Sequence, residues 1–167
     1  MSSAPVIILL GSDRPIPGDS GRLWRAVDGE PKYRRVLLVD AAPAHFDFGP
    51  GVSVWVGRQI ESLNEQADPA AVTALLAVGQ EPAPGHEAEF NAWMDEEHVP
   101  GLGAAPGTYS AHRYRSVYGE PDYFAVYHLR DLEVNSTPEW KQVGKSETSH
   151  AMKPHSRKRT RGLYVAE

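Results

Sequence analysis

The sequence contains no cysteine among its 167 residues. Disulfide bonds, thiolate nucleophiles and cysteine-based metal sites are therefore excluded. The chain also lacks an apolar run near the ~20 residues that a membrane-spanning helix needs. The longest such run, Val6 to Leu10, follows no basic residue and precedes Asp13 and Arg14, which is not the pattern of a signal peptide. We expect a cytoplasmic protein without membrane contact.

An excess of positive charge is missing as well, because the formal net charge is −5. A nucleic-acid partner would need a basic face to offset its phosphates, so we expect none. One basic run, Lys153 to Arg161, could form a phosphate or carboxylate site, although a solvated approach to the last strand is the simpler interpretation. The chain has no phosphate-binding glycine loop and no zinc-helix histidine pair, so we predict no cofactor and no metal.

The N-terminal part predicts a short β-rich segment. Residues 5–11 form a continuous apolar run typical of a strand buried on both faces, and residues 34–40 and 52–56 predict two further strands. Between them, Ser20 is a candidate N-cap for a short helix that carries Leu23 and Trp24 and ends at Gly29. Residues 58–66 fit either a short helix or a linker.

The C-terminal part has a clearer pattern. Residues 72–78 predict a strand, residues 86–99 show helical spacing, and residues 108–117 and 123–129 predict a hairpin across a short turn. Ser136 or Thr137 can cap a second helix with Pro138 in its first turn, and residues 159–165 predict the last strand.

This order is the β-α-β-β-α-β order of a ferredoxin-like module, so the fold class is α+β. We place the module at residues 71–167, and an N-terminal α/β extension or degenerate repeat at residues 1–70. A sheet with both helices on one face leaves the other face uncovered, and a second sheet is the economical cover. A homodimer is therefore expected, with a pseudo-duplicated monomer as the alternative.

Several stretches resemble the dimeric α/β-barrel superfamily, in particular its ether-degradation accessory-type and polyketide cyclase-type proteins. They are the first-helix segment at residues 89–102, the strand that follows Pro106 and Gly107, the strand at residues 121–129, and the start of the second helix at residues 137–140. The resemblance implies a barrel fold and leaves the reaction open, since this superfamily includes cyclases, dehydratases and cofactor-free monooxygenases.

Four residues are candidates for acid–base chemistry. His98 can exchange a proton near neutral pH, and a helix end together with Asp95 would favour its charged form. Tyr114 and His128 lie on related strand faces that can border one cavity, where a tyrosine can stabilise an oxyanion and a histidine can remove a proton. Arg113 can clamp a carboxylate or phenolate. Helix capping, interface packing and a strand-edge charge are the structural alternatives.

Aromatic side chains are the candidates for the walls of a substrate pocket: Trp93, Trp140, Trp24, Trp55 and Tyr127. Core packing is the alternative role for each of the tryptophans. Together these residues predict a cofactor-independent lyase or cyclase for a small aromatic or polyketide-like substrate. The alternatives are a cofactor-free aromatic monooxygenase and a non-catalytic small-molecule-binding accessory dimer.

Overall fold

The computed structural model describes residues 3–64 and 68–167. Its strands are β1 (Val6–Ser12), β2 (Arg22–Gly29), β3 (Tyr33–Val39), β4 (Ser53–Leu63), β5 (Ala74–Pro82), β6 (Thr108–Tyr118), β7 (Tyr123–Leu129) and β8 (Ser156–Ala166). Its helices are α1 (Glu87–Trp93), α2 (Val99–Gly103), α3 (Pro138–Val143) and α4 (Glu147–Met152). Shorter helical segments are η1 (Pro69–Ala71), the π-helical η2 (Met94–His98), η3 (Leu132–Ser136) and η4 (Lys153–His155).

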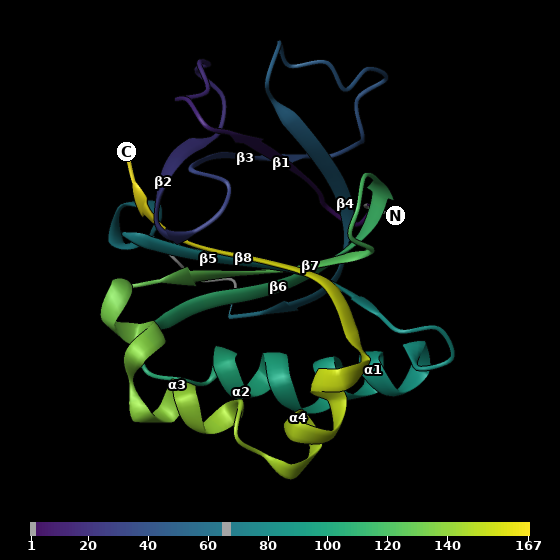
Figure 1. Cartoon of the computed structure of the whole chain (residues 1–167). Coiled ribbons are helices and arrows are strands. Elements are labelled where there is room, and N and C mark those ends of the chain that lie inside the picture. Colours follow the sequence, from purple (N-terminus) through teal and green to yellow (C-terminus); the bar gives the residue numbers. More distant parts are fainter. Residues whose placement is uncertain (1–2, 65–67) are drawn as a thin grey trace.

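The C-terminal strands form the predicted ferredoxin-like arrangement. They lie in the order β8-β5-β7-β6, with every neighbouring pair antiparallel. The helices that follow β5 and β7 cover one face of this sheet (Figure 1). The first helix buries Phe90 and Trp93 and exposes Glu87, as its helical spacing predicts. Thr137 caps α3 by accepting a hydrogen bond from the Trp140 amide, with Pro138 in the first turn.

The N-terminal strands repeat the same order without helices. They lie as β4-β1-β3-β2, which matches β8-β5-β7-β6 strand for strand. The predicted helix after Ser20 is therefore wrong, because these residues form β2, paired with both β3 and β8. Residues 58–63 continue β4, and the remaining part of that predicted helix or linker reaches Gln66, outside the described residues.

Two ladders join the repeats into a closed eight-stranded barrel. Strand β2 pairs with β8, and β4 pairs with β6, so the barrel closes within one chain. The N-terminal strands thus cover the sheet face that a second subunit was expected to cover (Figure 1). The homodimer stays a prediction. The N-terminal strands now cover the sheet face that was its reason. Among the described residues, no helix is long and apolar enough to cross a membrane.

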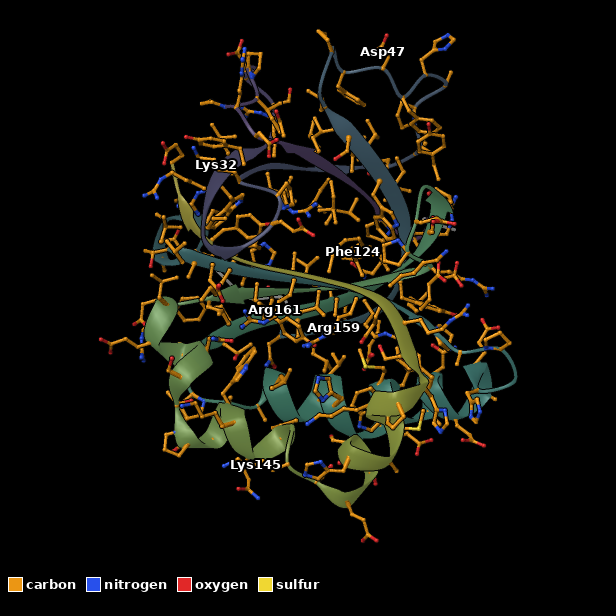
Figure 2. The ribbon with its side chains drawn as sticks, viewed as in Figure 1. Lys32, Asp47, Phe124, Lys145, Arg159 and Arg161 are labelled. Carbon is orange, nitrogen blue, oxygen red and sulfur yellow. The ribbon has the colours of Figure 1, made fainter. Side chains whose placement is uncertain are left out.

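The barrel interior is filled by side chains from every strand. Its members include Ile7, Trp24, Val36, Trp55, Leu75, Tyr114, Phe124 and Tyr164, one from each of β1 to β8. A second apolar cluster lies between the C-terminal sheet and the helices. A third lies on the outer face of the N-terminal strands, where Ile16, Phe46 and Phe48 from loops take the place of helices. Figure 2 shows side chains filling the space between these layers.

Packing inside the barrel leads to a test of its rigidity. A Cβ atom at Gly57 would lie 2.3 Å from two ring carbons of Trp55. That ring is buried and fixed, because its indole N–H donates to the Pro121 carbonyl at 2.7 Å. We expect Gly57→Ala to lower the free energy of unfolding by about 1–3 kcal/mol. Urea denaturation measures this loss.

The control is Gly144→Ala, whose added Cβ would meet nothing closer than the Lys141 carbonyl oxygen at 3.8 Å. Its free energy of unfolding should stay near that of the wild type. Equal losses in the two variants would show that Trp55 can move aside.

Candidate functional site

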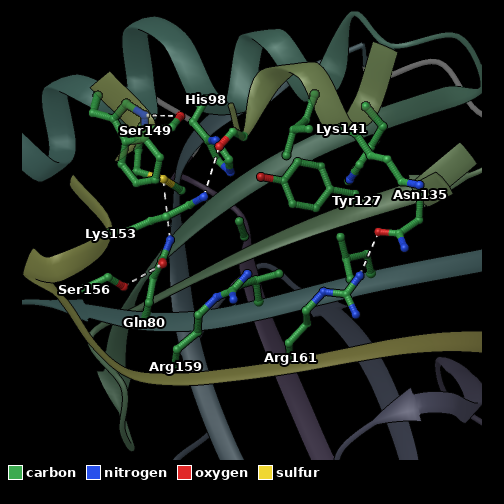
Figure 3. Close-up of a pocket in the computed structure, with 18 residues that line it drawn as sticks. Gln80, His98, Tyr127, Asn135, Lys141, Ser149, Lys153, Ser156, Arg159 and Arg161 are labelled. Carbon is green, nitrogen blue, oxygen red and sulfur yellow. Dashed lines mark hydrogen bonds between the residues drawn. The ribbon is translucent and has the colours of Figure 1, made fainter. Parts of the chain in front are cut away.

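A cavity of about 460 Å³ lies between the helices and the helix-facing side of the C-terminal sheet. Strands β5, β7 and β8 supply its floor, and the helical segments supply its roof (Figure 3). Small residues open this space in a layer that is otherwise packed. Ala125 on β7 and Gly144 after α3 are among the residues that line it.

Aromatic side chains form the walls. Trp93 lies in the roof, and its indole N–H donates to the Ser149 hydroxyl at 3.2 Å, which fixes the ring. Tyr127 on β7 and Trp140 on α3 meet edge to face, with ring centroids 5.4 Å apart. Such surfaces favour a flat apolar or aromatic ligand.

His98 enters the cavity from the end of η2. Its ring lies 4.6 Å from that of Trp93, and neither ring nitrogen is hydrogen-bonded to any residue of the described ranges. Burial, followed by the positive charge of Arg159, lowers the pKa of His98 to about 4. The imidazole is therefore neutral at neutral pH and has a lone pair available for a proton.

This differs from the expected electrostatics of His98. The helix does not end there, because α2 continues directly from Val99, so no C-terminal dipole favours the charged ring. Asp95 does not orient the ring either. It forms an ion pair with Arg113 at 2.5 Å instead.

Tyr127 presents its hydroxyl to the same space. The residue is 1% exposed, and its hydroxyl has no hydrogen-bond partner within residues 3–64 and 68–167. In Figure 3 this hydroxyl points towards the middle of the cavity. Burial raises the pKa of Tyr127, so the group stays protonated and can donate a hydrogen bond to a ligand oxygen.

The charge of the lining is all of one sign. Four cationic side chains border the cavity, namely Lys141, Lys153, Arg159 and Arg161, and its described lining contains no aspartate or glutamate. Gln80 supplies a neutral polar group, held by the Ser156 hydroxyl at 2.9 Å. The cavity therefore favours an anionic ligand or an anion formed during a reaction.

Solved structures with this architecture are similar in fold and distant in sequence. A provisionally assigned monooxygenase of Fusobacterium nucleatum has a TM-score of 0.66 and 11% identity, covering 99% of this chain and 94% of that one. An anthrone oxidase-like protein has a TM-score of 0.65 and 11% identity, covering 100% and 92%. A major regulator of staphylococcal pathogenesis has a TM-score of 0.62 and 9% identity, covering 98% and 99%.

These similarities show the fold, which is the ferredoxin-like α+β fold predicted from the sequence. In this member of the fold, both sheets of the barrel come from one chain. No family model matches the sequence, and no curated protein matches it.

The residues predicted for the site divide between two faces of the sheet. His98, Trp93, Trp140 and Tyr127 line the cavity. Trp24, Trp55 and Tyr114 lie in the barrel interior instead, where they belong to one apolar cluster. The sheet therefore separates the aromatic residues that were expected to form one pocket, because alternate strand residues point to opposite faces.

His128 and Arg113 also lie away from the cavity lining. His128 shares a hydrogen bond of 3.0 Å with the Ser110 hydroxyl, and burial lowers its pKa to about 4. Arg113 is fully buried and donates to Asp95 at 2.5 Å and to Asn91 at 2.7 Å. Both side chains have protein partners, in keeping with structural roles.

Glu61 on β4 lies beside the Arg113–Asp95 pair. Burial, followed by a hydrogen bond with Asp95, raises the pKa of this carboxyl group to about 7. Glu61 and Asp95 both lie outside the cavity lining. No group of three or more potential metal ligands occurs among the described residues.

Sequence reasoning missed the cationic floor. Arg159 and Arg161 belong to the basic run that was interpreted chiefly as a solvated approach to the last strand. Arg159 is exposed, as that interpretation expects, and it also lines the cavity together with the half-buried Arg161. The signal was the alternation itself, since Arg159, Arg161 and Leu163 are spaced by two and share one strand face.

The lowered pKa values of His98 and His128 predict a loss of stability in acid. Their folded-state pKa values, about 4, lie below the ordinary histidine value of 6.5, so the unfolded state binds more protons between these pH values. Their contribution is complete above pH 6.5 and is lost as the pH falls towards 4. We expect His98→Gln to reduce the loss of unfolding free energy between pH 7.5 and 5 by about 2 kcal/mol.

Urea titrations at both pH values measure this difference. The exposed His45→Gln is the control and should lose as much stability as the wild type. An unchanged pH dependence in His98→Gln would contradict a desolvated imidazole at this position.

Proposed function

We propose that this protein is an enzyme that removes a proton from an enolisable aromatic substrate in the cavity and lets the carbanion react with dioxygen. The cavity carries the proposal, because it joins aromatic walls, a neutral base and an all-cationic border in one space. Two proteins of the same fold have names that point to such oxidations, a provisionally assigned monooxygenase and an anthrone oxidase-like protein.

His98 is the proposed base. Its imidazole is neutral and free of hydrogen bonds to described residues, so it can accept a proton from a carbon next to a carbonyl or from a phenol. A pKa of about 4 makes protonation unfavourable in the empty cavity. The negative charge that develops on the substrate offsets this cost, because the imidazolium and the enolate form an ion pair.

Tyr127 is the proposed oxyanion donor. Its buried hydroxyl lacks a partner in the described chain and points into the cavity, where it can donate to the oxygen of the developing enolate (Figure 3). The cationic border favours the same charge. The role expected for Tyr114 thus passes to a tyrosine on the opposite face of the sheet.

The oxidation then balances without another reductant. The substrate's methylene carbon loses two hydrogens and four electrons in total, and dioxygen accepts them. One oxygen atom becomes the new carbonyl, and the other leaves as water. Attack of oxygen on the carbanion and loss of water from the resulting hydroperoxide accomplish this change.

The lyase or cyclase hypothesis shares the first step. A carbanion held by the same residues can instead eliminate water or close a ring, with no oxygen consumed. The accessory-binder hypothesis needs the cavity and no proton transfer. Oxygen consumption and the effect of His98 therefore separate the three.

The first functional test is oxygen uptake with anthrone as the probe. We expect one dioxygen consumed per anthraquinone formed, and no turnover under nitrogen. Product analysis by liquid chromatography accompanies the oxygen electrode. Conversion of polyketide-like substrates at an unchanged rate under nitrogen would favour a lyase or cyclase, and binding without any conversion would favour a binder.

Variants of the cavity test the assigned roles. We expect His98→Ala to lower kcat by about a hundredfold or more, since general-base catalysis contributes about 10²–10⁴-fold. Tyr127→Phe should lower kcat by about tenfold through the loss of one hydrogen bond to the oxyanion. Tyr114→Phe, in the barrel interior, is the matched control and should keep the wild-type kcat. Equal losses in both tyrosine variants would contradict the assignment.

A further inference from the structure

Strand β8 places two arginines on the floor of the cavity. Arg159 and Arg161 project towards the helices from the strand face that also carries Leu163 (Figure 3). Leu76, Ala125 and Leu129 of the neighbouring strands are apolar and pack beneath the helices. Arg161 is half-buried there, and Arg159 lines the cavity while it stays exposed to solvent.

In the described part of the chain, groups of the protein pair with Arg161 but not with Arg159. Arg161 donates to the Asn135 side-chain oxygen at 2.7 Å and to the carboxylate of Asp28, which is 72% exposed, at 3.2 Å. Arg159 has neither a hydrogen bond nor an ion pair with any residue in the described ranges. Burial, and then the charge of Arg161, lower the pKa of Arg159, so its neighbour repels it. The donors of Arg159 are therefore available to an anionic ligand.

The other described polar groups of the lining supply no negative charge. Lys153 donates to the Gly144 carbonyl oxygen at 3.1 Å, and Lys141 adds another cation. Gln80 is neutral and bound to Ser156. An anion that enters the cavity would therefore meet donors already in place and no carboxylate to repel it.

We infer that the cavity takes an aromatic carboxylate, with the carboxylate group bound by Arg159 and Arg161 and the ring held between Trp93, Tyr127 and Trp140. The inference deepens the proposed function, because it names the substrate class of the same cavity. A guanidinium presents paired N–H donors that match the two oxygens of a carboxylate. A volume of about 460 Å³ suits an aromatic acid of a few fused rings.

The carboxylate also has a consequence for His98. Arg159 is the foremost charged group that lowers the pKa of His98, ahead of Lys153 and Arg113, while Glu97 acts in the opposite direction. A carboxylate bound at Arg159 reduces this repulsion, and the pKa of His98 then rises towards neutrality. Binding of the substrate would thus make the base stronger at the moment when it is needed.

Binding of matched probes tests the inference directly. We expect 2-naphthoate to quench the fluorescence of Trp93 and Trp140 on binding, and the neutral 2-naphthamide to bind at least about tenfold more weakly. Inorganic phosphate should not displace naphthoate at equal concentration. Equal affinity for naphthoate and naphthamide, no binding of naphthoate, or displacement by phosphate would each overturn the inference.

Variants identify the group that binds the carboxylate. Arg159→Gln should weaken naphthoate binding by about tenfold or more and leave naphthamide binding unchanged, whereas Arg159→Lys should keep part of the affinity. Arg157→Gln removes an exposed charge of the same strand outside the cavity lining and is the control. If it weakens binding as much as Arg159→Gln does, the attraction is only that of the overall charge.

The pKa of His98 gives a second measurement. In NMR titrations it should rise when naphthoate binds to the wild type and stay unchanged with naphthamide. These results do not depend on turnover: carboxylate binding without oxygen uptake would reject the proposed function alone, and oxidation of neutral substrates with no preference for carboxylates would reject this inference alone.

Discussion

The closing ladders of the barrel determine how the rest of the protein is arranged. Strand β2 pairs with β8 and β4 pairs with β6, so residues far apart in sequence saturate the backbone hydrogen bonds at both edges of each four-stranded repeat. A closed sheet has no free edge and one enclosed face. Large side chains from all eight strands fill that face, and the candidate cavity lies on the outer face instead.

The outer face is not used equally by the two repeats. Loops with Phe46 and Phe48 cover the N-terminal strands closely, whereas helices span the C-terminal strands and leave a cavity beneath them. The two repeats therefore share a strand order and differ in the segments that cover their outer faces. The helix-free repeat completes the barrel, and the helix-bearing repeat holds the candidate site (Figure 1).

Competition between burial and charge gives this cavity its chemistry. Burial keeps His98 neutral and Tyr127 protonated, while Arg159 and Arg161 of β8 supply positive charge on the floor. A proton acceptor, a hydrogen-bond donor and a positive field thereby face one space. The Arg113–Asp95 pair shows the contrasting outcome, because there the cation and the carboxylate satisfy each other and no charge is left for a ligand.

Local pattern determined the C-terminal β-α-β-β-α-β order, since helical spacing around Phe90 and Trp93 and the cap at Thr137 act over a few residues. It also brought His98, Trp93, Trp140 and Tyr127 forward as candidates. Only the tertiary structure decided that residues 22–29 are a strand, because β2 is held by pairing with β3 and the distant β8. It likewise decided that Tyr114, Trp24 and Trp55 fill the barrel while Arg159 faces the cavity, since alternation fixes which residues share a face, and packing fixes what that face meets.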